Sequence, residues 1–236
     1  MRIGPVTREQ LLRLRMQWSQ GDHVLVTGPT KSGKTELTRR LDQIRIDAGS
    51  YVVVFVCKLQ PDETILKSYA GWTRWTRWHK RVKPTENRIL LWPRVEGKSV
   101  DEAMALMREV FEEALKEISK TGKWTVHLDE GLLLSSPHFL GLSDLIGMMY
   151  ALMRTAKATM ITLAQRPAHL PVAIYPNLSH AFIGRASELP DLKRLADMDG
   201  PSSRQLRDVI MANGTHDFTW IKVGSKEPPE QVNLIR

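Results

Sequence analysis

The sequence lacks the features of a secreted, metal-binding or membrane-spanning protein. Its 236 residues include a single cysteine, Cys57, which excludes an internal disulfide and fits a reducing cytosol. No stretch approaches the roughly 18 apolar residues that a membrane span requires, and the N-terminus has no apolar core of a secretion signal. The seven histidines show no metal-site spacing. We therefore expect a cytoplasmic protein with no integral membrane segment.

Acidic residues are the minority charge. The chain has 26 Asp and Glu against 34 Lys and Arg, a formal charge of +8, which favours a polyanionic partner such as nucleic acid or an anionic membrane surface. Composition does not choose between these two. With 42% apolar and 25% charged residues, the chain is an ordinary globular protein that can bury one core.

The segment GPTKSGKT, residues 28–35, is the strongest motif. An apolar run precedes it at 23–27 and a helical pattern follows it, so it connects a strand to a helix as a phosphate-binding loop does. Glycines let backbone N–H groups approach the phosphates, Lys34 supplies charge to the β- and γ-phosphates, and the Thr35 hydroxyl can ligate Mg²⁺. The alternative, a glycine turn with a chance lysine, does not explain both flanking elements. The predicted nucleotide-binding residues are Gly28, Pro29, Thr30, Lys31, Ser32, Gly33, Lys34, Thr35 and Glu36.

A second apolar strand, 124–128, ends in two carboxylates, Asp129 and Glu130. Open parallel sheets bind ligands at the carboxyl ends of their strands, so these side chains are expected beside the phosphate loop. Asp129 would hold Mg²⁺ and Glu130 would deprotonate the attacking water. One carboxylate suffices for binding, whereas two indicate hydrolysis. His127 is interpreted as a packed core histidine.

A further strand, 158–164, runs into Gln165-Arg166-Pro167. A neutral amide at a strand end can hydrogen-bond the γ-phosphate or the lytic water without adding charge. We predict this role for Gln165; the alternative is a loop residue before a proline.

The segment GWTRWTRWHKRVK, 71–83, is predicted to be helical, with a tryptophan edge beside an arginine edge. Three uses stay open: a nucleic-acid surface in which indoles stack on bases, a helix whose tryptophans enter the core, and a docking surface for a protein. The candidate nucleic-acid contacts are Arg74, Arg77, Arg81, Lys80, Trp72 and Trp75.

The remaining pattern predicts an alternating α/β chain with three parts. An N-terminal helix lies within residues 1–22, an ATPase domain spans 23–223 with an insertion at about 58–98, and a C-terminal tail, 224–236, forms an extended arm. A capping-box spacing opens the long helix 99–120. Further strands are expected at 51–57, 89–92, 181–184 and 217–223, and further helices at 8–20, 140–157, 190–198 and 202–211.

The ordered set GPTKSGKT, TVHLDE, ITLAQRP, HAFIGR and DLKRLADM resembles the FtsK/HerA superfamily of ring-forming ATPases. The resemblance, from about His23 to Trp220, implies a RecA-like fold of the ASCE division, with a mainly parallel sheet and helices on both faces. It also implies a homo-hexameric ring with ATP and Mg²⁺ between subunits, and translocation of double-stranded DNA. By the same resemblance, Arg154 matches an arginine that reaches the ATP of a neighbouring subunit. Arg185 is the second candidate for this role. The predicted catalytic residues are Glu130, Lys34, Gln165 and Arg154.

In size and plan the chain is similar to genome-packaging ATPases of tailless, membrane-containing double-stranded DNA viruses. This implies viral genome packaging, with capsid or membrane-vertex proteins as partners and a location in the host cytoplasm or on the virion. Conjugation, chromosome segregation and phage assembly remain alternatives. A protein of another class, a nucleotide-gated DNA-binding protein or scaffold with little turnover, is also open, although Glu130 argues against it.

Overall fold

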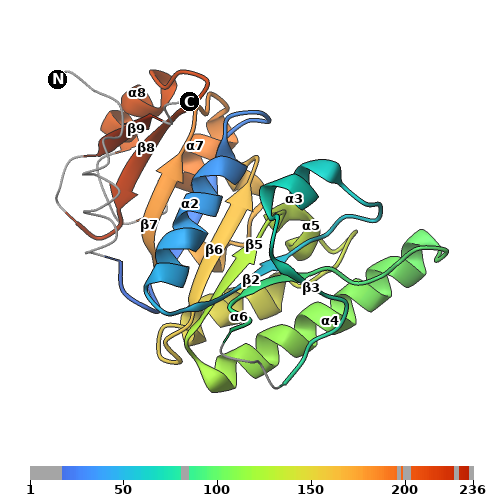
Figure 1. Cartoon of the computed structure of the whole chain (residues 1–236). Helices are drawn as coiled ribbons and strands as arrows, with labels where there is room; N and C mark the ends of the chain where they lie inside the picture. Colours follow the sequence, from blue (N-terminus) through green and yellow to red (C-terminus); the bar gives the residue numbers. More distant parts are fainter. Residues whose placement is uncertain (1–17, 81–84, 196–197, 199–202, 226–228, 234–236) are drawn as a thin grey trace.

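The structure, a computed structural model, describes residues 18–80, 85–195, 198, 203–225 and 229–233. In these residues one sheet of nine strands has the order β3-β4-β2-β5-β6-β1-β7-β8-β9 (Figure 1). Its strands are β1 (His23–Thr27), β2 (Tyr51–Phe55), β3 (Thr73–Trp75), β4 (Arg88–Leu91), β5 (Trp124–Leu128), β6 (Thr159–Ala164), β7 (Leu178–Ile183), β8 (Asp217–Lys222) and β9 (Glu230–Asn233). The seven neighbouring strands β3-β4-β2-β5-β6-β1-β7 are parallel to one another. Strand β8 pairs antiparallel with β7, and β9 pairs antiparallel with β8.

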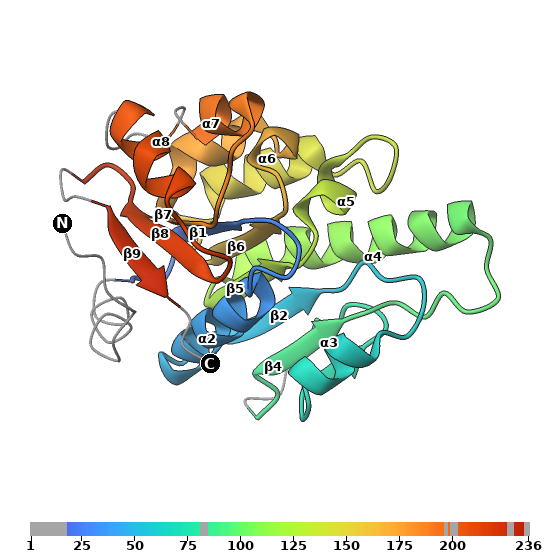
Figure 2. The same ribbon diagram turned by 90° about the horizontal axis from the view of Figure 1, so that it is seen from above.

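Helices cover both faces of this sheet (Figure 2). The first face carries α2 (Lys34–Asp47) and α3 (Glu63–Ser68), and the second carries α4 (Val100–Thr121) and α6 (Ser143–Leu152). The second face also has α5 (Gly131–Ser135), the 3₁₀ turns η1 (Pro167–His169) and η2 (Val172–Asn177), α7 (Leu189–Leu195) and α8 (Ser203–Met211). The fold is α/β and RecA-like, as the sequence predicts. The central strands are mostly apolar and almost completely buried, because both of their faces are covered.

The longest helix, α4, begins where the sequence predicts. The Ser99 hydroxyl accepts a hydrogen bond from the Glu102 backbone N–H, and the Glu102 carboxylate accepts one from the Ser99 backbone N–H, which completes the capping box. Phe111 and Ile118 are fully buried on its inner face. Met107 is also buried on that face, whereas Leu106 is only partly buried.

The predicted helix at 71–83 is wrong. Residues 73–75 instead form β3, which pairs with β4, and the Trp92 backbone N–H donates to the Trp75 carbonyl at 2.8 Å. The open edge of β4 offers hydrogen bonds that outweigh the helical spacing of the tryptophans. Residues 81–84 lie outside the described part of the chain.

Both ends of the chain differ from the predicted structure in their described residues. An arm was expected after Gly224, but residues 230–233 form β9 and return to the sheet beside β8. Most of the helix predicted at 8–20 lies outside the described residues, and its described end, 18–20, is not helical. None of the described helices combines the length and apolar character that crossing a bilayer requires.

Candidate nucleotide-binding site

The loop between β1 and α2 is shaped by its glycines. Gly33 caps α2 in the left-handed region at φ 93°, where glycine pays no steric cost. A Cβ on Gly28 would lie 3.0 Å from Ser32 Oγ and 3.3 Å from the Gly184 Cα, so the loop and the end of β7 can approach only because both positions are glycine. The N-terminus of α2 therefore faces the hollow of the loop, a geometry suited to anions.

Lys34 lies at the first turn of α2 and folds over this loop. Its Nζ donates to the carbonyl oxygens of Gly28 and Pro29, each at 2.8 Å. An ammonium group has three donors, so one remains for a ligand. Burial lowers the pKa of Lys34, and the nearby Glu130 and Asp129 oppose that shift.

The two carboxylates follow β5 at its carboxyl end. Burial raises the pKa of Asp129, against the opposing charges of His127 and Lys58. Burial and the neighbouring Asp129 raise the pKa of Glu130, which Lys58 and Lys34 oppose. Lys58 Nζ lies 3.9 Å from Glu130 Oε1. Both acids thus sit in a weakly solvated position, where a nearby cation stabilises their charged form.

The sheet order brings these segments together. Because β6 lies between β1 and β5, the carboxyl ends of the three strands are neighbours. A cavity of about 200 Å³ lies there, and the Thr30 hydroxyl donates to Gln165 Oε1 at 3.3 Å across the strand ends. Its lining includes Thr30, Lys31, Lys34, Thr35, Asp129, Glu130 and Gln165 from the predicted set, together with Lys58, Asp62 and Thr64 near α3.

The donors in this cavity fit magnesium bound together with a nucleotide. Among the described residues there is no cluster of three or more His, Cys, Asp or Glu able to hold a metal alone. Mg²⁺ in phosphate sites uses one or two protein oxygens together with phosphate and water, and the Thr35 hydroxyl and the half-buried Asp129 line the same cavity. Thr35 and Asp129 are the residues that would hold it.

His127 is a buried core residue, in line with its predicted role. Its Nδ1 lies 2.9 Å from Asp42 Oδ2 on α2, and both side chains are fully buried. Burial alone would lower the pKa of His127, but Asp42 outweighs it and the net shift is upward. The pair links the helix that follows the phosphate loop to the strand that carries Asp129.

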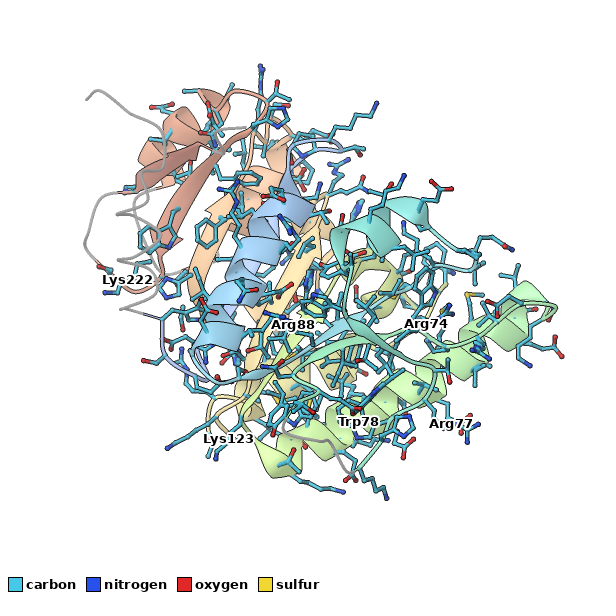
Figure 3. All side chains as sticks on the ribbon, in the orientation of Figure 1. Arg74, Arg77, Trp78, Arg88, Lys123 and Lys222 are labelled. Atoms are coloured by element: carbon cyan, nitrogen blue, oxygen red, sulfur yellow. The ribbon has the colours of Figure 1, made fainter. Side chains whose placement is uncertain are left out.

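The tryptophans of the 71–83 segment belong mainly to the core. Trp75 and Trp78 are 5% and 7% exposed, and Trp72 packs in part against the cluster under α3. Arg74 is engaged as well, since its Nε donates to the Trp92 carbonyl at 3.1 Å and its guanidinium lies over the Trp92 ring. Figure 3 shows Trp78 alongside α4 and Arg77 at the edge of the molecule. Arg77 and Lys80 remain as exposed cations, while Arg81 lies outside the described residues.

The two candidate arginines lie at opposite ends of the parallel strands. Arg154 follows α6 and precedes β6, at the amino ends of the parallel strands, and its Nη2 donates to Ser179 Oγ at 2.8 Å. It is therefore remote from the phosphate loop of its own chain. Arg185 follows β7 at the carboxyl end and lines a second cavity that also includes Gly28 and Gln165.

Several solved structures are similar to this chain. The B204 DNA-packaging ATPase from Sulfolobus turreted icosahedral virus is similar, with a TM-score of 0.65 and 15% identity over 93% of this chain and 100% of that one. The chain has a RecA-like P-loop ATPase fold. B204 of Sulfolobus turreted icosahedral virus 2, in complex with sulfate, matches at a TM-score of 0.66 and 14% identity, covering 93% and 99% of the two chains. VirB4 of Thermoanaerobacter pseudethanolicus matches at 0.63 and 9%, covering 91% and 89%.

These neighbours confirm the α/β RecA-like fold that the FtsK/HerA resemblance implies. No protein-family model matches the chain, and no curated protein matches its sequence.

Sequence reasoning missed one cation of the site, Lys58. It lies three residues beyond β2, at the same edge of the sheet as the phosphate loop, and approaches Glu130. Its position just after a buried strand is the feature that could have identified it, since the ends of parallel strands meet at one edge.

Proposed function

We propose that this protein is a Mg²⁺-dependent ATPase that moves double-stranded DNA. Viral genome packaging is the biological role that we propose for this activity. The observation that carries the ATPase proposal is the meeting of Lys34, Asp129, Glu130 and Gln165 around one cavity at the carboxyl ends of β1, β5 and β6. The ATPase domain is assigned to residues 23–223. The fold likeness to B204, structures of which contain AMPPCP or ATP-gammaS, supports a nucleotide as the ligand.

Each residue has a distinct task in this proposal. The loop N–H groups and Lys34 bind the phosphates, Glu130 takes the proton of the attacking water, and Gln165 hydrogen-bonds the γ-phosphate or that water. Magnesium, bound by Thr35 and Asp129, would neutralise charge on the phosphate oxygens. Burial around Asp129 and Glu130 strengthens these electrostatic interactions because little water screens them.

The test of the proposed function is ATP hydrolysis with and without double-stranded DNA. A motor couples hydrolysis to its track, so we expect the rate of phosphate release to rise when DNA is added. Equal rates would support ATPase activity without translocation. Conjugation, chromosome segregation and phage assembly remain alternative roles, because each would use the same nucleotide chemistry.

Arg154 is proposed to complete the ATP site of a neighbouring subunit in a homo-hexameric ring. Arg154→Ala should leave ATP affinity within about twofold and lower hydrolysis by about 10³-fold, because a guanidinium in trans stabilises the transition state. Mixing Arg154→Ala with Glu130→Gln protein should restore part of the turnover, since some mixed interfaces contain both intact groups. Phosphate release measured across mixing ratios checks this. Arg185→Ala in the same mixing experiment tests the second candidate for this role. A mixture of the Arg154→Ala and Glu130→Gln proteins that stays inactive contradicts the shared site.

The exposed cations Arg77 and Lys80 are proposed as DNA contacts. Their double replacement by glutamine should weaken DNA binding and lower the slope of log K against log salt by about 0.9 for each lost phosphate contact. Fluorescence anisotropy over a salt series measures the slope. The control is Lys98→Gln with Lys116→Gln, which removes the same charge from exposed sites elsewhere. An identical slope in both double variants would assign the segment to a structural role.

A further inference from the structure

The segment that follows Gln165 is held mainly by Asp191 on α7, and Glu188, just before α7, also forms an ion pair with Arg166. Asp191 Oδ2 accepts a hydrogen bond from Arg166 Nε at 3.2 Å, and Asp191 Oδ1 accepts one from the Ala168 backbone N–H at 3.0 Å. The two donors lie on either side of Pro167. A single carboxylate therefore fixes the chain both before and after the proline.

The helix α7 also contacts this segment indirectly, through the side chain of Tyr175. The Tyr175 hydroxyl donates to the Pro167 carbonyl at 2.6 Å, and the Arg194 guanidinium lies 5.8 Å from the centre of the Tyr175 ring. Asp191 and Arg194 are three residues apart and so lie on one face of α7. Both belong to the DLKRLADM segment, which the FtsK/HerA resemblance includes without a chemical role.

Asp191 is placed as a fixed support rather than a mobile surface group. The residue is 5% exposed, and Leu195 of the same helix is fully buried in the main core. Asp191 and Gln165 line a cavity of about 300 Å³ together with Gly28 and Arg185, whereas Glu130 lines the cavity of about 200 Å³ described above. The buried Asp191 carboxylate therefore lies beside the residues that follow Gln165 and contacts them directly.

Gln165 itself depends on that support. Its side chain is exposed, and its hydrogen bond with the Thr30 hydroxyl is long at 3.3 Å. An exposed amide side chain loses conformational entropy when it is held in one orientation. That loss is smaller when the backbone that carries the side chain is already fixed. The ties at Arg166, Pro167 and Ala168 supply that fixed backbone.

We propose that Asp191 is a positioning residue for hydrolysis, which acts by holding residues 166–168 so that the Gln165 amide faces the phosphate loop. The proposal rests on the proposed ATPase function and on the role given there to Gln165. Asp191 contacts no substrate in this arrangement. Its effect passes entirely through Gln165, which makes the two residues energetically dependent on each other.

A double-mutant cycle tests this dependence with the full chain. Gln165→Ala should lower kcat by about 100-fold, as expected when one donor to the transition state is removed. Asp191→Asn keeps the volume and an oxygen for the Ala168 N–H but loses one of the two charges that bind Arg166, since Glu188 remains. It should lower kcat by about 10-fold through misplacement of the amide. The double variant should be no slower than Gln165→Ala alone, because an absent amide cannot be misplaced further.

Two controls separate positioning from damage to the fold. The affinity for a non-hydrolysed ATP analogue should stay within about twofold in Asp191→Asn, which gives a change in kcat without a change in binding. Lys193→Gln alters an exposed charge on the same helix and should leave kcat unchanged within about twofold. Asp191→Ala, which removes both acceptors, should be slower than Asp191→Asn and equally non-additive with Gln165→Ala.

The outcomes distinguish this proposal from the proposed function. Losses that multiply to about 1000-fold in the double variant, or equal losses of kcat and nucleotide affinity in Asp191→Asn, would overturn the positioning role and leave the ATPase intact. A Gln165→Ala variant with normal turnover would refute the role of Gln165 and the positioning role together. A wild-type chain that hydrolyses no ATP would refute the proposed function itself.

Discussion

Lys34→Ala should lower the affinity for ATP by at least about 100-fold, close to 3 kcal/mol, and abolish measurable hydrolysis. The reason is the loss of a charge-assisted contact to the β- and γ-phosphates in a partly buried loop, where water replaces the ammonium poorly. Isothermal titration calorimetry with ATP and Mg²⁺ measures the affinity, and a phosphate-release assay measures turnover.

The control for this variant lies in the same loop. Lys31→Ala removes the same charge from an exposed side chain and should weaken ATP binding much less. Because Lys34 Nζ also bonds the carbonyls of Gly28 and Pro29, the melting temperature of each variant should be compared with that of the wild type. Wild-type affinity in a folded Lys34→Ala protein would refute the assignment of residues 28–35 as the nucleotide loop.

Glu130→Gln should leave ATP affinity within about threefold and lower kcat by about 10²- to 10⁴-fold. The amide keeps the size of the side chain but cannot accept the proton of the attacking water, so binding and chemistry are separated. The structure adds a second consequence, since the variant also loses the ion pair with Lys58 at 3.9 Å. Steady-state phosphate release and ATP affinity on the same preparation measure the two effects.

The matched control is Glu63→Gln, the same chemical change on α3 at an exposed position paired with Lys67. It should retain wild-type turnover. If Glu130→Gln protein hydrolyses ATP as fast as the wild type, Glu130 is not the general base. If both proteins bind ATP and neither turns it over, the chain is a nucleotide-gated binding protein or scaffold.

Local sequence predicted the parts of the fold that depend on neighbouring residues. The loop at 28–35, the capping box of α4 and the carboxylates after β5 each consist of residues close together in the chain, and the structure contains all three features. The parallel sheet could be predicted as well, because buried strands read as unbroken apolar runs.

The 71–83 segment shows why other predictions went wrong. Its tryptophans repeat every third residue, a spacing typical of a helix, yet the free edge of β4 makes residues 73–75 a strand. The tail was likewise predicted to be an arm, and the open edge of β8 pairs with residues 230–233 instead. Such pairing depends on partners distant in the chain, which periodicity does not report.

By itself, the sequence determined that a glycine-rich loop with Lys34 follows β1, that two carboxylates follow β5, and that both strands belong to one parallel sheet. Only the tertiary structure decided that Lys58 approaches Glu130, that His127 pairs with Asp42, and that Asp191 holds the residues after Gln165. The physical reason is that motifs arise from covalent neighbours, whereas these polar contacts form between side chains that only the packing of helices on the sheet brings within hydrogen-bond reach.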